Sequence, residues 1–143
     1  MTLVYPDTSV LVSAYVEEAF SLIAETWLIS ILPGDMVSSA WCETEIASAL
    51  AAKARARQIS PTDRPQMLAM ITAMLHATAR FIPINKRHFE SAGDLLSRSA
   101  LPLGSGDALH LAVAAAAGAT LVTLDRRMAE AGLGLGLDVQ LLG

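Results

Sequence analysis

Four acidic positions lie where a strand is expected to end or a helix to begin, which are places where carboxylates can carry chemistry. They are Asp7, Asp107, Asp125 and one of Glu43 or Glu45. Asp7 and Asp125 each follow a short β-prone run, and Asp107 opens a helix. Ligands of open α/β sheets bind beyond the carboxyl ends of the strands, so these side chains are expected to converge there.

Convergence of three or four carboxylates predicts a site for a divalent cation. Their mutual repulsion raises some of the pKa values, and a bound cation removes this conflict. Ligands that are all oxygen, without cysteines or a placed pair of histidines, favour Mg²⁺ or Mn²⁺ over zinc. Such ions activate water and neutralise charge on a phosphodiester during in-line displacement. The predicted reaction is therefore hydrolysis of a phosphate ester.

Each acid also has a purely structural interpretation. Asp7 can form a turn or cap a helix, and Asp125 can be the N-cap of the helix that follows it. Asp107 and Glu43 can complement helix dipoles, which is worth about 0.3–1 kcal/mol for each. No single acid decides between the two interpretations.

Helix geometry leaves the choice between Glu43 and Glu45 open. At about 100° per residue the two side chains point roughly 160° apart, so at most one of them faces the site. The apolar direction set by Ile46, Ala49 and Leu50 places Glu43 nearer the core side and Glu45 on its flank. Helix geometry therefore slightly favours Glu43 as the site residue, but a cleft at the edge of the domain can accommodate the side chain of either glutamate.

Composition predicts one domain of 143 residues with a core of small aliphatic side chains, because 53% of the residues are hydrophobic and only 5% are aromatic. The 14 Asp and Glu against 10 Lys and Arg give a net charge of −4, which excludes a generally basic coat for nucleic acid but not a local basic strip. The lone Cys42 can form neither an internal disulfide nor a cysteine zinc site, so a reducing cytoplasm fits the chain.

The chain alternates short strands with helices. Strands are expected at residues 2–5, where Pro6 ends the strand, and at 36–38, 81–84, 120–124 and 138–142. Helices are expected at residues 9–32 in one or two pieces, at 41–57 with Ser38 or Ser39 as cap, from Ser60-Pro61 to about 79, and at 86–99, 107–117 and 126–131. This alternation predicts an α/β fold, a three-layer α/β/α domain with a short parallel sheet of four to five strands.

Neither a secretory leader nor a membrane span is expected. The N-terminus lacks the basic and apolar regions of a signal peptide. The longest uncharged stretch, residues 108–124, includes His110, breaks at Gly118, and falls short of the about 20 apolar residues that a bilayer requires. His110 is expected in the core or beside the site, and His76 and His88 on helix surfaces.

Four segments, in order, resemble those of PIN-domain ribonucleases. They are residues 5–12 (YPDTSVLV), 45–50 (EIASAL), 106–112 (GDALHLA) and 121–129 (LVTLDRRMA). The closest group is the VapC toxins of type II toxin–antitoxin modules, and the resemblance covers essentially the whole chain. It implies a single PIN domain over residues 1–143.

The resemblance also assigns the site. It implies that Asp7, Glu45, Asp107 and Asp125 hold Mg²⁺ or Mn²⁺, with Thr123 near the attacking water. It decides for Glu45 over Glu43, because Glu45 is followed by the family's apolar residue and small-Leu pattern. Pro6 departs from the family, which usually has an aliphatic residue before the first aspartate.

The function implied is that of a metal-dependent endoribonuclease toxin with an RNA substrate, a homodimeric state and a VapB-like antitoxin that blocks the acidic cleft. Five basic residues near the acids can hold RNA phosphates. They are Lys53, Arg55, Arg57, Arg126 and Arg127. For at least one of Lys53, Arg55 and Arg57, a more ordinary interpretation is a solvated cation that stabilises the C-terminus of its helix.

Two other functions compete with this interpretation. One is a catalytically inactive PIN-like protein that binds RNA or a partner. The presence of an acid at all four positions argues against this function. The other is a phosphoacceptor receiver domain. It is disfavoured because the chain lacks paired acids near the N-terminus and a lysine after a later strand.

Overall fold

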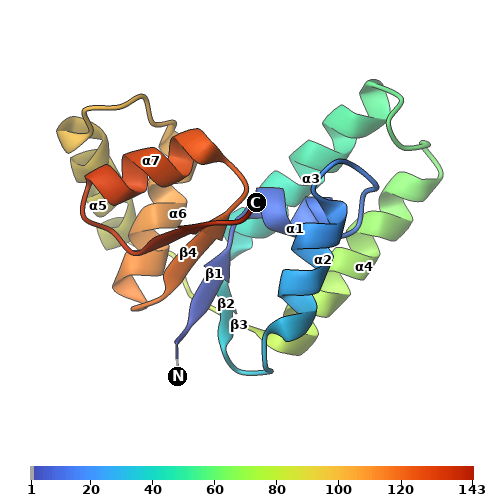
Figure 1. Cartoon of the computed structure of the whole chain (residues 1–143), viewed down its shortest axis with the longest axis horizontal. Coiled ribbons are helices and arrows are strands. Elements are labelled where there is room, and N and C mark those ends of the chain that lie inside the picture. Colours follow the sequence, from blue (N-terminus) through green and yellow to red (C-terminus); the bar gives the residue numbers. More distant parts are fainter. Residues whose placement is uncertain (1) are drawn as a thin grey trace.

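The computed structural model describes residues 2–143 and contains one parallel five-stranded sheet (Figure 1). Its strands are β1 (Val4–Pro6), β2 (Met36–Ser38), β3 (Ala79–Phe81), β4 (Thr120–Thr123) and β5 (Val139–Leu141). The strand order is β3-β2-β1-β4-β5, and each neighbouring pair is parallel. The predicted α/β class and parallel sheet are confirmed.

Seven helices in residues 2–143 connect the strands. They are α1 (Thr8–Ser13), α2 (Ser21–Ser30), α3 (Ala40–Arg55), α4 (Asp63–Thr78), α5 (Lys86–Arg98), α6 (Ser105–Ala116) and α7 (Arg126–Gly134). The chain steps from β1 to β3 at one edge and then returns to β4 and β5. Right-handed crossovers therefore place α1–α4 on one face and α5–α7 on the other, as Figure 1 shows. The switch in direction lies between β1 and β4.

Pro6 is the last residue of the central strand β1, which covers residues 4–6 rather than the predicted 2–5 and is followed by Asp7 as predicted. Backbone N–H groups alternate between the two neighbours of a strand. Val4 N donates to Asp35 O beside β2 (2.8 Å), and Asp7 N donates to Val122 O in β4 (2.9 Å). The missing N–H of Pro6 would face β2, and β1 pairs with β2 only at Val4. The proline thus interrupts no ladder.

Other boundaries shift by a few residues. The third strand is residues 79–81 rather than 81–84, because pairing with β2 begins directly after α4 ends. The helix predicted to open at Ser60-Pro61 begins at Asp63, and Ser60 Oγ accepts a hydrogen bond from Asp63 N (3.0 Å). Ser39 is at the N-cap position of α3, but its hydroxyl bonds to Tyr5 rather than capping the helix.

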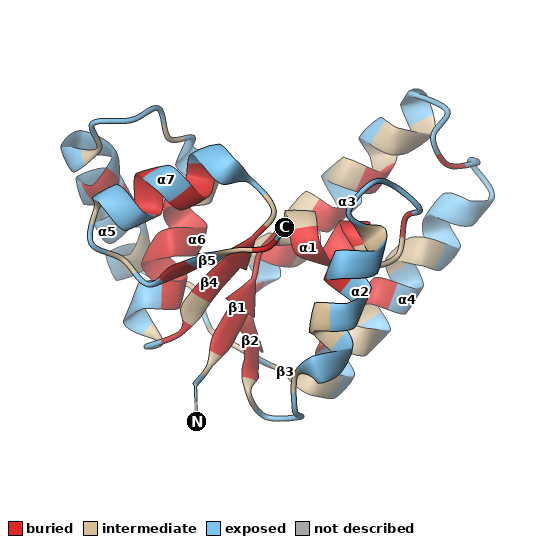
Figure 2. Cartoon of the chain, in the orientation of Figure 1, coloured by how far each residue is buried: buried red, intermediate tan, exposed pale blue. Residues whose placement is uncertain are grey.

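The core consists mainly of aliphatic side chains, as the composition predicts. Figure 2 shows the buried residues along β1, β2, β4 and α6. Helix α6 is the most deeply placed, with every residue from 108 to 114 buried. This burial fixes the N-terminal turn of α6, where Asp107 lies, against the end of the sheet. Within residues 2–143, no helix has the length and apolar character needed to cross a membrane.

Arg57 adopts a left-handed conformation (φ 61°) directly after α3. We expect Arg57→Gly to raise the free energy of unfolding by about 0.5–1 kcal/mol, because glycine adopts this conformation without the steric penalty of a side chain. Urea denaturation measures this change. The matched control is Gly118→Ala, which has φ 68° after α6 and open space around it. It should change stability in the opposite direction, and a loss of stability in Arg57→Gly would contradict the argument.

Candidate active site

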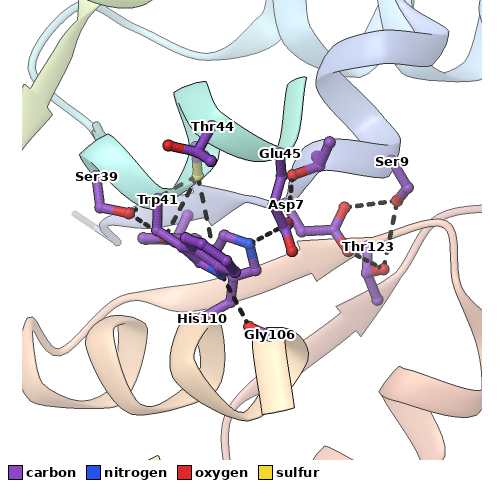
Figure 3. Close-up of polar contacts among 12 residues, drawn as sticks. Asp7, Ser9, Ser39, Trp41, Thr44, Glu45, Gly106, His110 and Thr123 are labelled. Carbon is purple, nitrogen blue, oxygen red and sulfur yellow. Dashed lines mark hydrogen bonds and ion pairs between the residues drawn. The ribbon is translucent and has the colours of Figure 1, made fainter. Parts of the chain in front are cut away.

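Asp7 lies buried at the carboxyl end of β1, where it also caps α1 (Figure 3). Its Oδ1 accepts hydrogen bonds from Ser9 Oγ (2.5 Å) and Val10 N (3.3 Å), and its Oδ2 accepts one from Thr123 Oγ1 (2.5 Å). Burial raises the pKa of Asp7, although these donors oppose the shift. The carboxylate is therefore held in one orientation from both sides.

Asp125 follows the adjacent strand β4 and is exposed. Its Oδ1 accepts hydrogen bonds from Arg127 N (2.9 Å) and Met128 N (3.2 Å), so the expected N-cap of α7 is present. Thr123 Oγ1 accepts a hydrogen bond from Asp125 N (2.9 Å) while donating to Asp7. Thr123 thereby ties together the residues that end the two central strands.

Glu45 extends from α3 toward α1 and α6. Its Oε1 accepts hydrogen bonds from Thr8 Oγ1 (2.8 Å) and His110 Nε2 (2.6 Å). Burial acts to raise the pKa of Glu45, but the hydrogen bond and charge of His110, with the bond from Thr8, lower it overall. Glu43 instead reaches His76 of α4 (2.6 Å). The structure therefore differs from the helix-geometry argument, because the flank of α3 that carries Glu43 faces α4.

Asp107 lies in the first turn of α6, and the charges of the other three acids affect its pKa. Burial raises its pKa to about 6, and repulsion from Asp7, Asp125 and Glu45 adds to the shift. Segments from the beginning, middle and end of the chain converge at the switch between β1 and β4.

A buried group of polar side chains contacts Glu45 through His110 (Figure 3). The Tyr5 hydroxyl lies 2.7 Å from both His110 Nδ1 and Ser39 Oγ, and Cys42 Sγ donates to it at 3.3 Å. Burial acts to lower the pKa of His110, but its hydrogen bonds to Cys42 and Glu45 raise it. Of this group, the sequence pointed only to His110. No sequence pattern distinguishes Tyr5 and Ser39 from ordinary residues near the ends of strands.

Gly106 packs against Glu45. A Cβ at this position would lie 2.8 Å from Glu45 Oε2 and 3.3 Å from Trp41 Cζ2. We expect Gly106→Ala to lower the phosphate-ester hydrolysis predicted from the sequence by about 10- to 100-fold, because ångström-scale displacement of a reacting group has effects of this size. Stability should change little, since the end of a glutamate side chain can move. Steady-state kinetics and thermal melts measure the two effects.

Gly104→Ala is the matched control for this prediction, because nothing lies within 4 Å of its added Cβ. It should retain wild-type activity. Equal activity of the two alanine variants would show that the position of Glu45 is not critical.

The other predicted basic residues have varied environments. Lys53 forms an ion pair with Glu18 (2.7 Å), whereas Arg55 and Arg57 are exposed near the end of α3. The remaining pair, residues 126 and 127, is exposed on the first turn of α7. Of the surface histidines, His76 is exposed, and His88 is half-buried in the capping box of α5.

The acids fit Mg²⁺ or Mn²⁺ by their chemistry, since the converging side chains are hard oxygen donors whose repulsion a cation relieves. No three Asp, Glu, His or Cys side chains in residues 2–143 already form a compact cluster of metal ligands. Mg²⁺ commonly binds through one or two carboxylates and keeps several waters.

Comparison with protein families defines the class to which this fold and site belong. The family model described as PIN domain matches residues 4–133. This match covers most of the sequence, so the chain belongs to the PIN domain family. The predicted resemblance to this family is confirmed, and no curated protein sequence matches the chain.

Several solved structures share the fold at low sequence identity. VapC20 from Mycobacterium tuberculosis, a sarcin-ricin loop cleaving toxin, has a TM-score of 0.70 at 19% identity, covering 90% of this chain and 95% of that one. VapBC2 from Rickettsia felis, bound to a promoter DNA fragment, has 0.69 at 17%, covering 99% and 100%. FitAcB from Neisseria gonorrhoeae has 0.69 at 15%, covering 96% of each chain. At sequence identities this low, the structural similarity shows a common fold and nothing more.

Proposed function

We propose that this chain is a Mg²⁺- or Mn²⁺-dependent endoribonuclease that hydrolyses RNA phosphodiester bonds as the toxin of a type II toxin–antitoxin module. The observation that carries the proposal is the placement of the four acids around the switch point of the sheet. Asp7 and Asp125 follow the adjacent strands β1 and β4, Asp107 lies in the first turn of α6, and Glu45 is hydrogen-bonded to Thr8 of α1 and His110 of α6. Repelling carboxylates at the ligand-binding end of an α/β sheet are what a divalent-cation hydrolase requires.

In this proposal Asp7, Glu45, Asp107 and Asp125 hold the ion, which supplies Lewis-acid stabilisation of the phosphodiester and activation of water. The protein's own hydrogen bonds orient these acids before substrate binds. Ser9 and Thr123 hold Asp7, while Thr8 and His110 hold Glu45. Such preorganisation lowers the cost of assembling the reacting groups.

The structural neighbours support the biological assignment. VapC20 is described as a toxin that cleaves the sarcin-ricin loop, and VapBC2 was solved on a DNA fragment from its promoter. By this likeness the substrate of our chain is RNA, and its partner is a VapB-like antitoxin that covers the acidic site. The proposal also includes a cytoplasmic location, a homodimeric state and one PIN domain over residues 1–143.

The test is to map new RNA 5′ ends after brief induction of the wild type and of Asp7→Asn. The asparagine keeps the size of the side chain and an oxygen to cap α1, but it removes the charge. New ends are expected in the wild type alone, and they identify the substrate. The absence of new ends with wild-type protein would favour the inactive partner-binding alternative, and equal ends with both proteins would show that cleavage does not depend on the charge of Asp7.

A further inference from the structure

A pocket of about 420 Å³ lies between α1, the loop that precedes α2, α3 and the segment that follows β4. Its wall includes Thr8, Ser9 and Asp125. Thr8 donates to Glu45, and Ser9 donates to Asp7. The pocket and the acidic site therefore share a wall formed by Thr8 and Ser9.

Glu18 and Lys53 form an ion pair in the wall of the pocket, and their opposite charges largely balance. Glu18 Oε2 lies 2.7 Å from Lys53 Nζ, and Glu18 Oε1 accepts a hydrogen bond from Ser13 Oγ (2.5 Å). Burial acts to raise the pKa of Glu18, but Lys53 and Ser13 lower it overall, which keeps the carboxylate ionised at neutral pH. Both partners remain partly accessible, with 20% of the Lys53 side chain and 32% of the Glu18 side chain exposed.

This arrangement does not suit a phosphate group. A phosphate site needs a cation whose charge is not already balanced, and here Glu18 balances Lys53 while Asp125 adds a negative charge at the rim. The remaining walls are apolar and include Phe20, whose side chain is exposed, and Leu124. A flat ligand with an apolar face and polar edges matches these walls and this ion pair.

We propose that the pocket binds a nucleobase of the RNA strand next to the scissile phosphate and so sets the cleavage preference. Phe20 stacks on the face of the base, Glu18 accepts hydrogen bonds from its edge, and Lys53 both orients Glu18 and donates to base carbonyl or ring nitrogen atoms. This inference rests on the proposed ribonuclease function, which it deepens by assigning a specificity subsite.

The experiment compares cleavage of a synthetic RNA pool with randomised positions, in Mn²⁺, by sequencing the 5′ ends produced. The variants are Glu18→Gln and Phe20→Ala, which act on the edge and the face of the base. Matched controls are Glu17→Gln and Leu22→Ala, exposed neighbours of the same kinds that do not line the pocket. Thermal melts establish that all four variants fold.

The wild type should prefer particular bases at one position beside the cut. Both pocket variants should reduce this preference by about fivefold or more, and should raise KM for the preferred RNA by about tenfold with kcat little changed. The two controls should match the wild type in preference and in both kinetic constants.

The outcomes separate this proposal from the function on which it rests. If the wild type cuts RNA and both pocket variants keep its base preference, the subsite is refuted while the ribonuclease function stands. If the pocket variants keep that preference but lose binding to a protein partner, the pocket is a protein site and the proposal is likewise overturned. If the wild type cuts no RNA, the proposed function falls, and the subsite falls with it.

Discussion

Replacing Asp107 with asparagine is expected to reduce RNA cleavage by at least about 10³-fold, because a metal ion contributes several kcal/mol of transition-state stabilisation and each 1.4 kcal/mol is a factor of ten. The reason lies in the position of Asp107, whose charge is opposed by three other carboxylates and by burial. Single-turnover cleavage of an RNA identified by end mapping measures the loss.

The same substitution should stabilise the folded chain in the absence of divalent ions. The pKa of Asp107 is raised to about 6, so the folded state prefers its protonated form. The favourable contribution of that form is present at low pH and is lost as pH rises through about 6. Asp107→Asn should therefore raise the free energy of unfolding by about 1 kcal/mol at pH 7.5, after allowance for solvent screening, and by much less at pH 4.

Urea denaturation in EDTA at the two pH values tests this expectation. Asp138→Asn is a suitable control, because Asp138 is an exposed aspartate at the opposite end of the sheet. A destabilised Asp107→Asn, or a gain that does not depend on pH, would show that the acids do not repel one another in the folded protein.

Removal of His110 should produce the largest loss of stability. Both His110 and His76 lie 2.6 Å from a glutamate, but the His110 side chain is 1% exposed and that of His76 is 58% exposed. Removing one partner of a buried pair costs about 3–5 kcal/mol, whereas exposed pairs contribute about 0–1 kcal/mol. We expect His110→Ala to lower the free energy of unfolding by about 3 kcal/mol and His76→Ala by less than about 1 kcal/mol.

The pH dependence of this loss distinguishes the ion pair from simple packing. The raised pKa of His110 means that its charged form contributes fully below its ordinary value of 6.5, and the contribution is lost at higher pH. The lowered pKa of Glu45 means that its contribution is present above 4.5 and is lost as pH falls further. The loss in His110→Ala should therefore be greatest between these values. A loss that stays constant from pH 5 to pH 9 would assign it to packing alone.

The sequence could predict where Asp7 and Asp125 lie in the fold, because their placement depends on local signals and on topology. Asp7 and Asp125 follow β-prone runs, and adjacent parallel strands bring their carboxyl ends to one edge of the sheet. Both also cap helices, so the functional and structural interpretations of these residues are compatible. One carboxylate can cap a helix and still face a shared site.

The features that the sequence did not predict depend on contacts between distant segments. Helix geometry leaned to Glu43 because it identified the apolar face of α3 but not which flank meets α4 and which meets α6. The tolerance of Pro6 depends on where the ladder to β2 stops. The ion pair of Glu18 with Lys53 joins a loop to a helix 35 residues away, and no local pattern marks it.

Calorimetric titration of Mn²⁺ into the wild type and Asp107→Asn, at pH 7.5, measures whether these carboxylates share one cation. We expect saturable binding by the wild type and binding weakened by at least about tenfold in the variant, the range expected when a group that supports a metal site is lost. Undetectable binding by the wild type, or equal affinity of both proteins, would contradict a shared cation site formed by these carboxylates.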